Sequence, residues 1–365
     1  MADMGRVQAK FCRWVLAVLL GFSAPRAAAM IFYASGDTNY NATPPTGSLT
    51  NSGWQWQGNW HGFGGTPIGT NLFLTAQHVG GSVGDVFSYN GTDHRAVAAF
   101  PDPISDLMIW QVCGTFPRFA PLYTGVPLEI YRPCVVFGRG RTRGGEVTVT
   151  NNGQVTLRGW AWGETDKRLR WGYNTVGGFI KDSGNGSDLL KVLFDPNGGA
   201  NVAALATGDS GGAVFMQGSS GWALAGINFA VDGPFNYVAS GPGFYAALFE
   251  QSGFYEESGT DWLVAGNGPS AFYATRVASR LSWIKNIITQ YDGREAVPIL
   301  EAADAVNGPF MVVTNATVDS SAKTITLQAP ATPQFYRLNG CVNLLGISGA
   351  GLSSGVLELT WTSGN

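Results

Sequence analysis

Residues 207–214 read Thr-Gly-Asp-Ser-Gly-Gly-Ala-Val, a serine set among glycines just before a run of strand-forming residues. The glycines let the backbone turn sharply, so Ser210 is expected to be exposed and closely approachable. The same turn can direct the backbone N–H groups of Gly208 and Ser210 towards one point, as an oxyanion hole requires. Taken alone, the stretch also fits an ordinary glycine-rich turn, so its meaning depends on the rest of the chain.

A nucleophilic serine needs a base, and the chain has three histidines. His78 comes directly after residues 72–77, Leu-Phe-Leu-Thr-Ala-Gln, an apolar strand that leads the imidazole into a turn. His61 and His94 lie in polar or glycine-rich segments. His78 is therefore the predicted base.

The base needs a carboxylate that orients its ring. Asp106 opens residues 106–110, Asp-Leu-Met-Ile-Trp, where a loop enters an apolar strand. Asp102 is the alternative, but prolines flank it and favour a solvated turn. We therefore predict a catalytic triad of His78, Asp106 and Ser210, in that chain order.

The composition favours an all-β fold. Of 365 residues only 13% are charged, 51 are glycine and 12% are aromatic, against averages of about 25% charge and 7% glycine. Short apolar runs alternate with turn pairs such as Asn90-Gly91 between about residues 53 and 265. The slightly acidic balance, 22 basic against 25 acidic residues, argues against a nucleic-acid partner.

The three motifs together resemble the trypsin/chymotrypsin family of serine endopeptidases. The resemblance rests on Thr-Ala-Gln-His at 75–78, Ser-Asp-Leu-Met-Ile at 105–109 and Gly-Asp-Ser-Gly-Gly at 208–212, and covers about residues 53–290. It implies two antiparallel six-stranded β-barrels with a C-terminal helix, and a triad between the barrels. By the same match His78 is the general base, Asp106 its orienting carboxylate and Ser210 the nucleophile, while Gly208 and Ser210 supply the oxyanion hole.

The expected activity is therefore hydrolysis of protein or peptide substrates through an acyl-enzyme, with no cofactor and no metal. A second hypothesis from another class is a protease-like binding protein that has weak or no turnover. The complete set of His78, Asp106 and Ser210 argues against it, because loss of activity commonly shows first in the triad.

The chain departs from the family pattern around its histidine and its serine. Phe63 and Val79 stand where the family has a cysteine pair, and no Ile-Val-Gly-Gly activation site precedes Trp54. A new amino terminus is therefore not expected to pair with Asp209. We predict His61 as its partner, with a plain surface histidine as the alternative.

Specificity is readable in outline. Ala204 stands six residues before Ser210, where an aspartate would select Lys or Arg, so trypsin-like cleavage is not expected. Phe229 and Val231 are predicted to form the pocket wall, with Phe272 or Ala271 opposite Val231. We expect a preference for small aliphatic P1 residues, and an insertion at about 232–268 beside the pocket.

Residues 1–29 have the layout of a secretory signal peptide. Basic residues precede the apolar run at 15–22, and small residues end at Ala27-Ala28-Ala29. We predict cleavage after Ala29, secretion to an extracellular or periplasmic compartment, and no membrane attachment after cleavage; a signal anchor is the alternative. The predicted domains are a signal peptide at 1–29, a protease domain at 30–293 and a β-rich module at 294–365.

Three cysteines remain beyond the signal segment: Cys113, Cys134 and Cys341. Their spacing does not fit a metal site. A Cys113–Cys134 bridge and separate buried thiols are both compatible with the sequence.

An apolar stripe at helical spacing predicts a helix over residues 274–290. Beyond it, residues 311–314 and 324–327 flank Asp319-Ser320-Ser321 and are expected to form a hairpin; strands are also predicted at 334–338 and 356–362. This module either caps the protease domain or attaches the protein to a surface or polymer, since residues 334–338 resemble a tail motif of secreted bacterial proteins.

Overall fold

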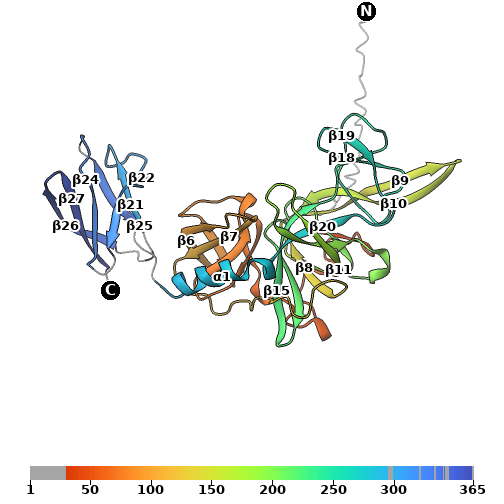
Figure 1. The fold of residues 1–365 in the computed structure, drawn as a ribbon, viewed down its shortest axis with the longest axis horizontal. Helices are drawn as coiled ribbons and strands as arrows, with labels where there is room; N and C mark the ends of the chain where they lie inside the picture. The colour runs from red at the N-terminus through yellow and green to blue at the C-terminus, as the bar shows by residue number, and fades with distance from the viewer. Residues whose placement is uncertain are drawn as a thin grey trace, which may run out of the picture.

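The computed structural model describes residues 30–294, 299–319, 322–332, 334–339, 341 and 345–363. The expected signal peptide and its cleavage point lie outside these residues. The described chain forms two closed antiparallel barrels of six strands each, followed by two small sheets (Figure 1). The sequence-based fold class, two barrels with a C-terminal helix and a small β-module, is confirmed.

The first barrel closes in the order β2-β3-β4-β7-β6-β5. Its core is aromatic: Phe73 and Phe87 stack with ring centroids 3.9 Å apart, and Trp60 packs on Phe73 and Trp110. Such pairs add to the free energy gained by burying the rings themselves. The strands are β2 (Gly58–Trp60), β3 (Phe63–Pro67), β4 (Leu72–Ala76), β5 (Val86–Tyr89), β6 (Thr92–Pro101) and β7 (Leu107–Val112).

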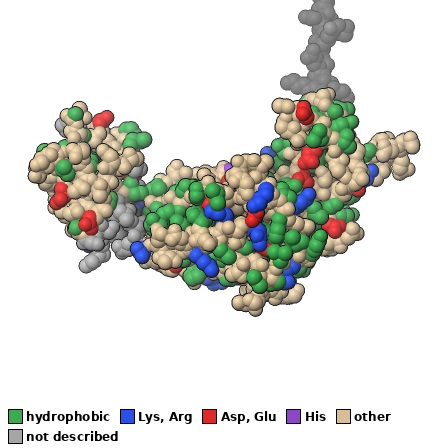
Figure 2. Space-filling model, in the orientation of Figure 1, with side chains coloured by type: hydrophobic (Ala, Val, Ile, Leu, Met, Phe, Trp, Pro, Cys, Tyr) green, Lys and Arg blue, Asp and Glu red, His purple; other side chains and the backbone are tan. Residues whose placement is uncertain are grey.

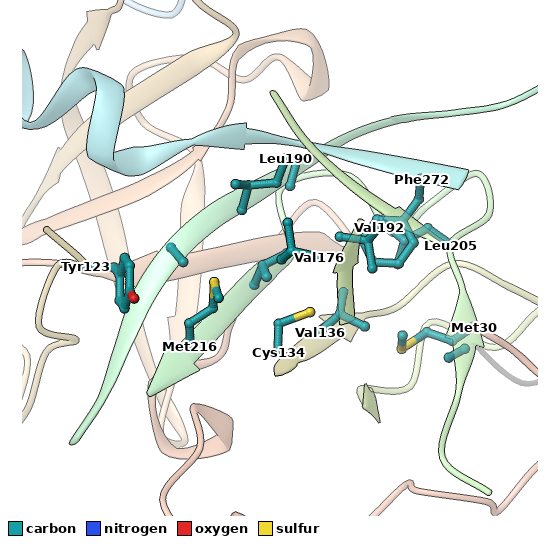
Figure 3. Close-up of a cluster of buried hydrophobic side chains, with 14 of the residues drawn as sticks. Met30, Tyr123, Cys134, Val136, Val176, Leu190, Val192, Leu205, Met216 and Phe272 are labelled. Carbon is teal, nitrogen blue, oxygen red and sulfur yellow. The ribbon is translucent and has the colours of Figure 1, made fainter. Parts of the chain in front are cut away.

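The second barrel closes in the order β11-β12-β20-β15-β14-β8. Its strands are β8 (Pro133–Gly138), β11 (Arg170–Lys181), β12 (Asp188–Leu193), β14 (Ala213–Gly218), β15 (Gly221–Val231) and β20 (Ala271–Arg276). Figure 3 shows the side chains that fill it, among them Cys134, Val136, Val176, Leu190 and Phe272. The strand after the Ser210 turn, β14, lies between β8 and β15 and is thus fixed on both edges.

A long hairpin projects from the second barrel (Figure 1), formed by β9 (Arg141–Asn151) and β10 (Gln154–Thr165). Asn152 and Gly153 both have positive φ, 50° and 78°, as the two-residue hairpin turns of this hand require. The hairpin is extended by β17 (Ala246–Leu248), and a separate sheet joins β16 (Phe235–Asn236), β18 (Tyr255–Ser258) and β19 (Asp261–Val264). A two-stranded sheet pairs β1 (Ile31–Phe32) with β13 (Ala203–Ala204).

The α-helix α1 spans Val277–Tyr291, so it begins three residues later than the apolar stripe predicts. Residues 274–276 belong instead to β20, where Ala274 pairs with Leu190 and Asn228. Two neighbouring strands therefore hold this segment extended against its helical spacing. Four short 3₁₀ helices complete the barrel domain: η1 (Gly47–Leu49), η2 (Trp54–Trp56), η3 (Gln77–Val79) and η4 (Pro196–Gly198). Within the described part of the chain, α1 included, no helix has the length and apolarity needed to cross a membrane.

The C-terminal module contains the sheets β22-β21-β25 and β23-β24-β27-β26. The expected hairpin is wrong in its partners: β24 pairs with residues 317–319, and residues 311–312 pair with β21 instead. The closer segment wins because it needs the shorter loop; residues 320 and 321 of the expected turn lie outside the described residues. The strands are β21 (Ile299–Ala303), β22 (Met311–Val312), β23 (Thr317–Asp319), β24 (Thr324–Gln328), β25 (Phe335–Asn339), β26 (Leu345–Ser353) and β27 (Val356–Ser363).

Charged side chains are sparse on the face shown in Figure 2, where tan and hydrophobic atoms predominate. This agrees with the low charge content of the chain. Among the described residues, no group of three or more His, Cys, Asp and Glu side chains could hold a metal ion.

Candidate active site

His78 lies where the buried strand β4 passes into η3, at the end of the first barrel. The pairing of β4 with β7 brings Ala76 opposite Leu107, and Gln77 N–H donates to the Asp106 carbonyl at 2.6 Å. The end of β4 therefore lies beside the start of β7, which places His78 and Asp106 side by side.

The Asp106 carboxylate contacts His78 twice. The backbone N–H of His78 donates to Oδ1 at 3.0 Å, and ring atom Nδ1 lies 2.6 Å from Oδ2. An ionised carboxylate only accepts hydrogen bonds, so Nδ1 carries the proton in this pair. The other ring nitrogen, Nε2, is then left as the acceptor.

Ser210 Oγ lies 2.8 Å from His78 Nε2. The structure thus brings all three predicted triad side chains together in one hydrogen-bonded chain, Ser210–His78–Asp106. The serine comes from the second barrel and its two partners from the first, so the site lies between the barrels. Gly64 N–H donates to the Ser210 carbonyl at 3.1 Å and ties the serine turn to the first barrel.

The serine turn depends on glycine. Gly208 and Gly211 have φ of +98° and +69°, a region that other residues seldom adopt. A side chain on Gly64 would overlap the Gly212 Cα where the two barrels meet. The predicted oxyanion donors, the N–H groups of Gly208 and Ser210, flank Asp209, whose own N–H donates to the Ala206 carbonyl at 3.1 Å.

The prediction that His61 pairs with Asp209 is wrong. His61 Nε2 lies 3.0 Å from Asp85 Oδ2, and both side chains are partly exposed. Asp209 instead accepts hydrogen bonds from two backbone N–H groups, Gly140 at 2.7 Å and Ala206 at 2.8 Å. Its carboxyl group is buried, and burial raises its pKa to about 7 although these bonds act in the opposite direction.

Asp102, expected to be a solvated turn residue, is buried and paired with Arg280 of α1. Arg280 Nε and Nη2 donate to its two carboxylate oxygens at 2.6 and 2.7 Å, and Ser105 Oγ donates at 2.5 Å. A bidentate arginine fixes a carboxylate in orientation as well as position. The pair thereby holds the loop that leads to Asp106 against the C-terminal helix.

Replacing Arg280 with alanine should lower the free energy of unfolding of the barrel domain by about 3 kcal/mol, because the buried Asp102 carboxylate would lose its charged partner. Denaturant titration followed by tryptophan fluorescence measures it. Lys181 pairs with Asp188 at 2.6 Å but its side chain is 70% exposed, so Lys181→Ala should cost less than about 1 kcal/mol. Equal losses in the two variants would show that the Asp102–Arg280 pair has no special role.

A pocket of about 100 Å³ opens beside Ser210. The structure places the predicted wall residues Phe229 and Val231 in its lining, and the Phe229 ring meets the His78 ring edge-on at 5.9 Å. Ala204 is not among the described residues that line this pocket. It lies in β13, where it is paired with Ile31 and packed in a neighbouring apolar cluster. The lining consists of Trp162, Leu205, Ala206, Thr207, Asp209, Ser210, Asn228, Phe229, Ala230 and Val231.

Trp162 is one of the lining residues that sequence reasoning missed. It comes from β10, and its ring stacks on Tyr245 with centroids 4.4 Å apart and planes 17° apart. Tyr245 belongs to the insertion at 232–268, whose strand β17 pairs with β10. The insertion thus lies next to the pocket, as expected, and packs against Trp162 through Tyr245. The register also decides the residue opposite Val231, which is Phe272.

No protein-family model and no curated protein matches the chain. Among solved structures the chain is similar to neuropsin, a serine protease expressed in the limbic system of mouse brain. The TM-score is 0.40 and the sequence identity 14%, over 64% of this chain and 94% of the neuropsin chain. Because the two sequences are so distant, the fold assignment rests on the barrels themselves: two closed six-stranded antiparallel barrels fit the chymotrypsin fold.

Proposed function

We propose that this protein is a secreted serine endopeptidase that cleaves protein or peptide substrates through Ser210. The observation that carries the proposal is the hydrogen-bonded chain from Ser210 Oγ to His78 Nε2 at 2.8 Å and from His78 Nδ1 to Asp106 at 2.6 Å. A serine is a weak nucleophile unless a base stands ready to take its proton, and these two bonds meet that need.

In the proposed reaction Ser210 Oγ attacks the scissile carbonyl while His78 Nε2 takes the hydroxyl proton. Asp106 stays ionised and stabilises the imidazolium that forms. The negative charge on the tetrahedral intermediate is met by the N–H groups of Gly208 and Ser210. His78 then gives its proton to the leaving amine, and water releases the acyl group by the same steps in reverse.

We further propose a preference for small aliphatic P1 residues. The pocket volume of about 100 Å³ supports this, because it is smaller than an apolar cavity of about 150 Å³ that holds a benzene ring. The Asp209 carboxylate, although part of the lining, is engaged by two backbone N–H groups rather than presented to a cationic side chain. Secretion and attachment through the C-terminal module stay proposals of the same kind.

Val231→Ala should widen the pocket and raise kcat/KM for Leu at P1, relative to Ala at P1, by about 10-fold, the effect of one or two methylene groups in an apolar pocket. Peptides that differ only at P1 measure it. Val264→Ala is the matched control, since Val264 is 75% exposed in β19 and outside the pocket lining. Faster cleavage of Lys or Arg than of Ala or Val substrates by the unmodified protein would contradict the specificity proposal.

The decisive test of the function is labelling by a fluorophosphonate probe, which reacts with an activated serine. The folded protein should be labelled at Ser210, as peptide mapping would locate, and Ser210→Ala should not be. Folded protein that is neither labelled nor active on a peptide library would favour the alternative, a protease-like binding protein.

A further inference from the structure

We propose that Cys113 and Cys341 form a disulfide bond that fastens the C-terminal module to the first barrel. Neither the triad nor the pocket lining contains these cysteines. The proposal rests on where the chain leaves the barrel, where it enters the module, and which thiols are then adjacent.

The chain leaves the barrel domain beside Cys113. Asn71 joins the end of β7 to the chain after α1. Its carbonyl accepts from Val112 N–H at 2.9 Å. Its side-chain amide donates to the Arg294 carbonyl at 2.9 Å and accepts from Gly293 N–H at 3.1 Å. Gln111 Nε2 also donates to the Arg294 carbonyl, at 3.0 Å. Arg294, the last described residue before the module, is therefore held against the end of β7, and Cys113 is the residue that follows this strand.

The first described strand of the module begins beside the end of β25, close to Cys341. Its first described residue, Ile299, is paired in register with Asn339 of β25, and Cys341 follows two residues later. Arg294 and Ile299 are five peptide units apart, a span of at most about 18 Å whatever path the chain takes. The connection thus keeps the Cys341 end of the module close to the Cys113 end of the barrel.

The two thiols meet. The Cys113 thiol is hydrogen-bonded to the Cys341 thiol, and this bond, helped by the nearby Arg95 guanidinium, lowers the pKa of Cys113 to about 7 against the cost of its partial burial. A substantial share of Cys113 is therefore thiolate at neutral pH, the form that attacks disulfides. No disulfide joins the described cysteines in the structure, so the proposed bond is one that these two adjacent thiols would form on oxidation.

Cys134, the partner that the sequence left open, is not suited to pair with Cys113. It lies inside the second barrel, among Val136, Met216 and the rest of the apolar cluster (Figure 3). Its burial is complete and raises the pKa of its thiol to about 12, which keeps it protonated and inert.

The oxidant is a disulfide, of a small thiol or of a thiol–disulfide oxidoreductase. The Cys113 thiolate attacks one of its sulfurs, forming a mixed disulfide and releasing one thiolate. Cys341 then loses its proton and attacks the Cys113 sulfur, which expels the second thiolate. Two protein thiols are oxidised by two electrons to one disulfide, and the oxidant is reduced to two thiols.

The test is oxidation of the purified full-length folded protein with glutathione disulfide, alkylation of remaining thiols and tryptic mapping without reduction. Cleavage at Lys and Arg, except before proline, puts the three cysteines on separate peptides, 96–118, 119–139 and 338–365. We expect one dominant crosslink, between 96–118 and 338–365, lighter by two hydrogens than the sum of its parts and lost on reduction. Any other dominant pairing, or three alkylated thiols, would overturn the proposal.

Two controls separate native proximity from chance. Oxidation in concentrated urea should scramble the pairing, because unfolding removes the contact between the two thiols. Cys134→Ala should retain the crosslink of the folded protein, whereas Cys341→Ser should leave Cys113 alkylated. The readout is independent of peptidase activity, so failure of the proposed function would leave this result intact.

Discussion

Replacing Ser210 with alanine should lower kcat for peptide hydrolysis by about 10⁶-fold, the loss seen when a triad serine is removed. Ser210 Oγ is hydrogen-bonded to His78 Nε2 at 2.8 Å, so the hydroxyl to be deprotonated and its base are already in contact. With alanine no acyl-enzyme can form. Single-turnover assays on a cleaved peptide from the P1 library would measure the loss.

The decisive feature of this result is its non-additivity. His78→Ala should cost about as much as Ser210→Ala, and the double variant should be no slower than either, since the residues act as one unit. Asp106→Asn should cost about 10⁴-fold, because the amide no longer holds the ring in the tautomer with a proton on Nδ1.

His61→Ala is the matched histidine control. His61 pairs with Asp85 on the first barrel, apart from the triad bonds, so its loss should change kcat by less than about two-fold. Full activity in Ser210→Ala would mean that another residue is the nucleophile. Losses that multiply in the double variant would mean that His78 and Ser210 act separately.

Short-range sequence patterns were enough to predict the two barrels and the proximity of His78 and Asp106. His78 follows the end of one apolar strand and Asp106 precedes the start of another, and antiparallel pairing of the two strands brings these positions together. The glycines around Ser210 predict a turn with positive φ angles, which other residues seldom adopt. These signals lie within a few residues of the side chains they position.

Contacts between distant segments could not be read in this way. Asp102 and Arg280 are 178 residues apart, and the prolines beside Asp102 indicate a turn without showing what that turn packs against. Trp162 reaches the pocket only because β10 extends past the barrel and β17 of a later insertion pairs with it. The place of Ala204 also depends on a distant segment: counting back from Ser210 assumes a loop of fixed shape, whereas residues 203–204 form a strand with β1.

Asp209 is the second residue whose replacement should have a large effect. It stands between the two predicted oxyanion donors, and its carboxylate oxygens accept from Gly140 and Ala206 N–H groups. Asparagine at this position must turn its NH₂ towards one of these donors, which breaks that bond and pushes the turn away. We expect kcat to fall by about 10²–10³-fold, the scale of a lost oxyanion donor, with a smaller change in KM.

The same residue should make stability depend on pH in a defined direction. Burial raises the pKa of Asp209 from 3.8 to about 7, so between these values the folded state binds a proton that the unfolded state has released. Stability from this group is therefore fully present below about pH 4 and is lost as pH rises through about 7, by on the order of 4 kcal/mol.

Asp209→Asn cannot titrate, so the difference in unfolding free energy between it and the unmodified protein should shift across this window by that amount, in favour of the variant at higher pH. Denaturant titrations at pH 4 to 8 measure the difference, and the other titrating groups cancel in it. Asp85→Asn, at a carboxylate that is partly exposed and paired with His61, is the control for kcat and should not show the loss. A difference that moves in favour of the unmodified protein as pH rises would mean that the Gly140 and Ala206 N–H groups outweigh burial and hold Asp209 ionised, as a fixed anion beneath the oxyanion turn.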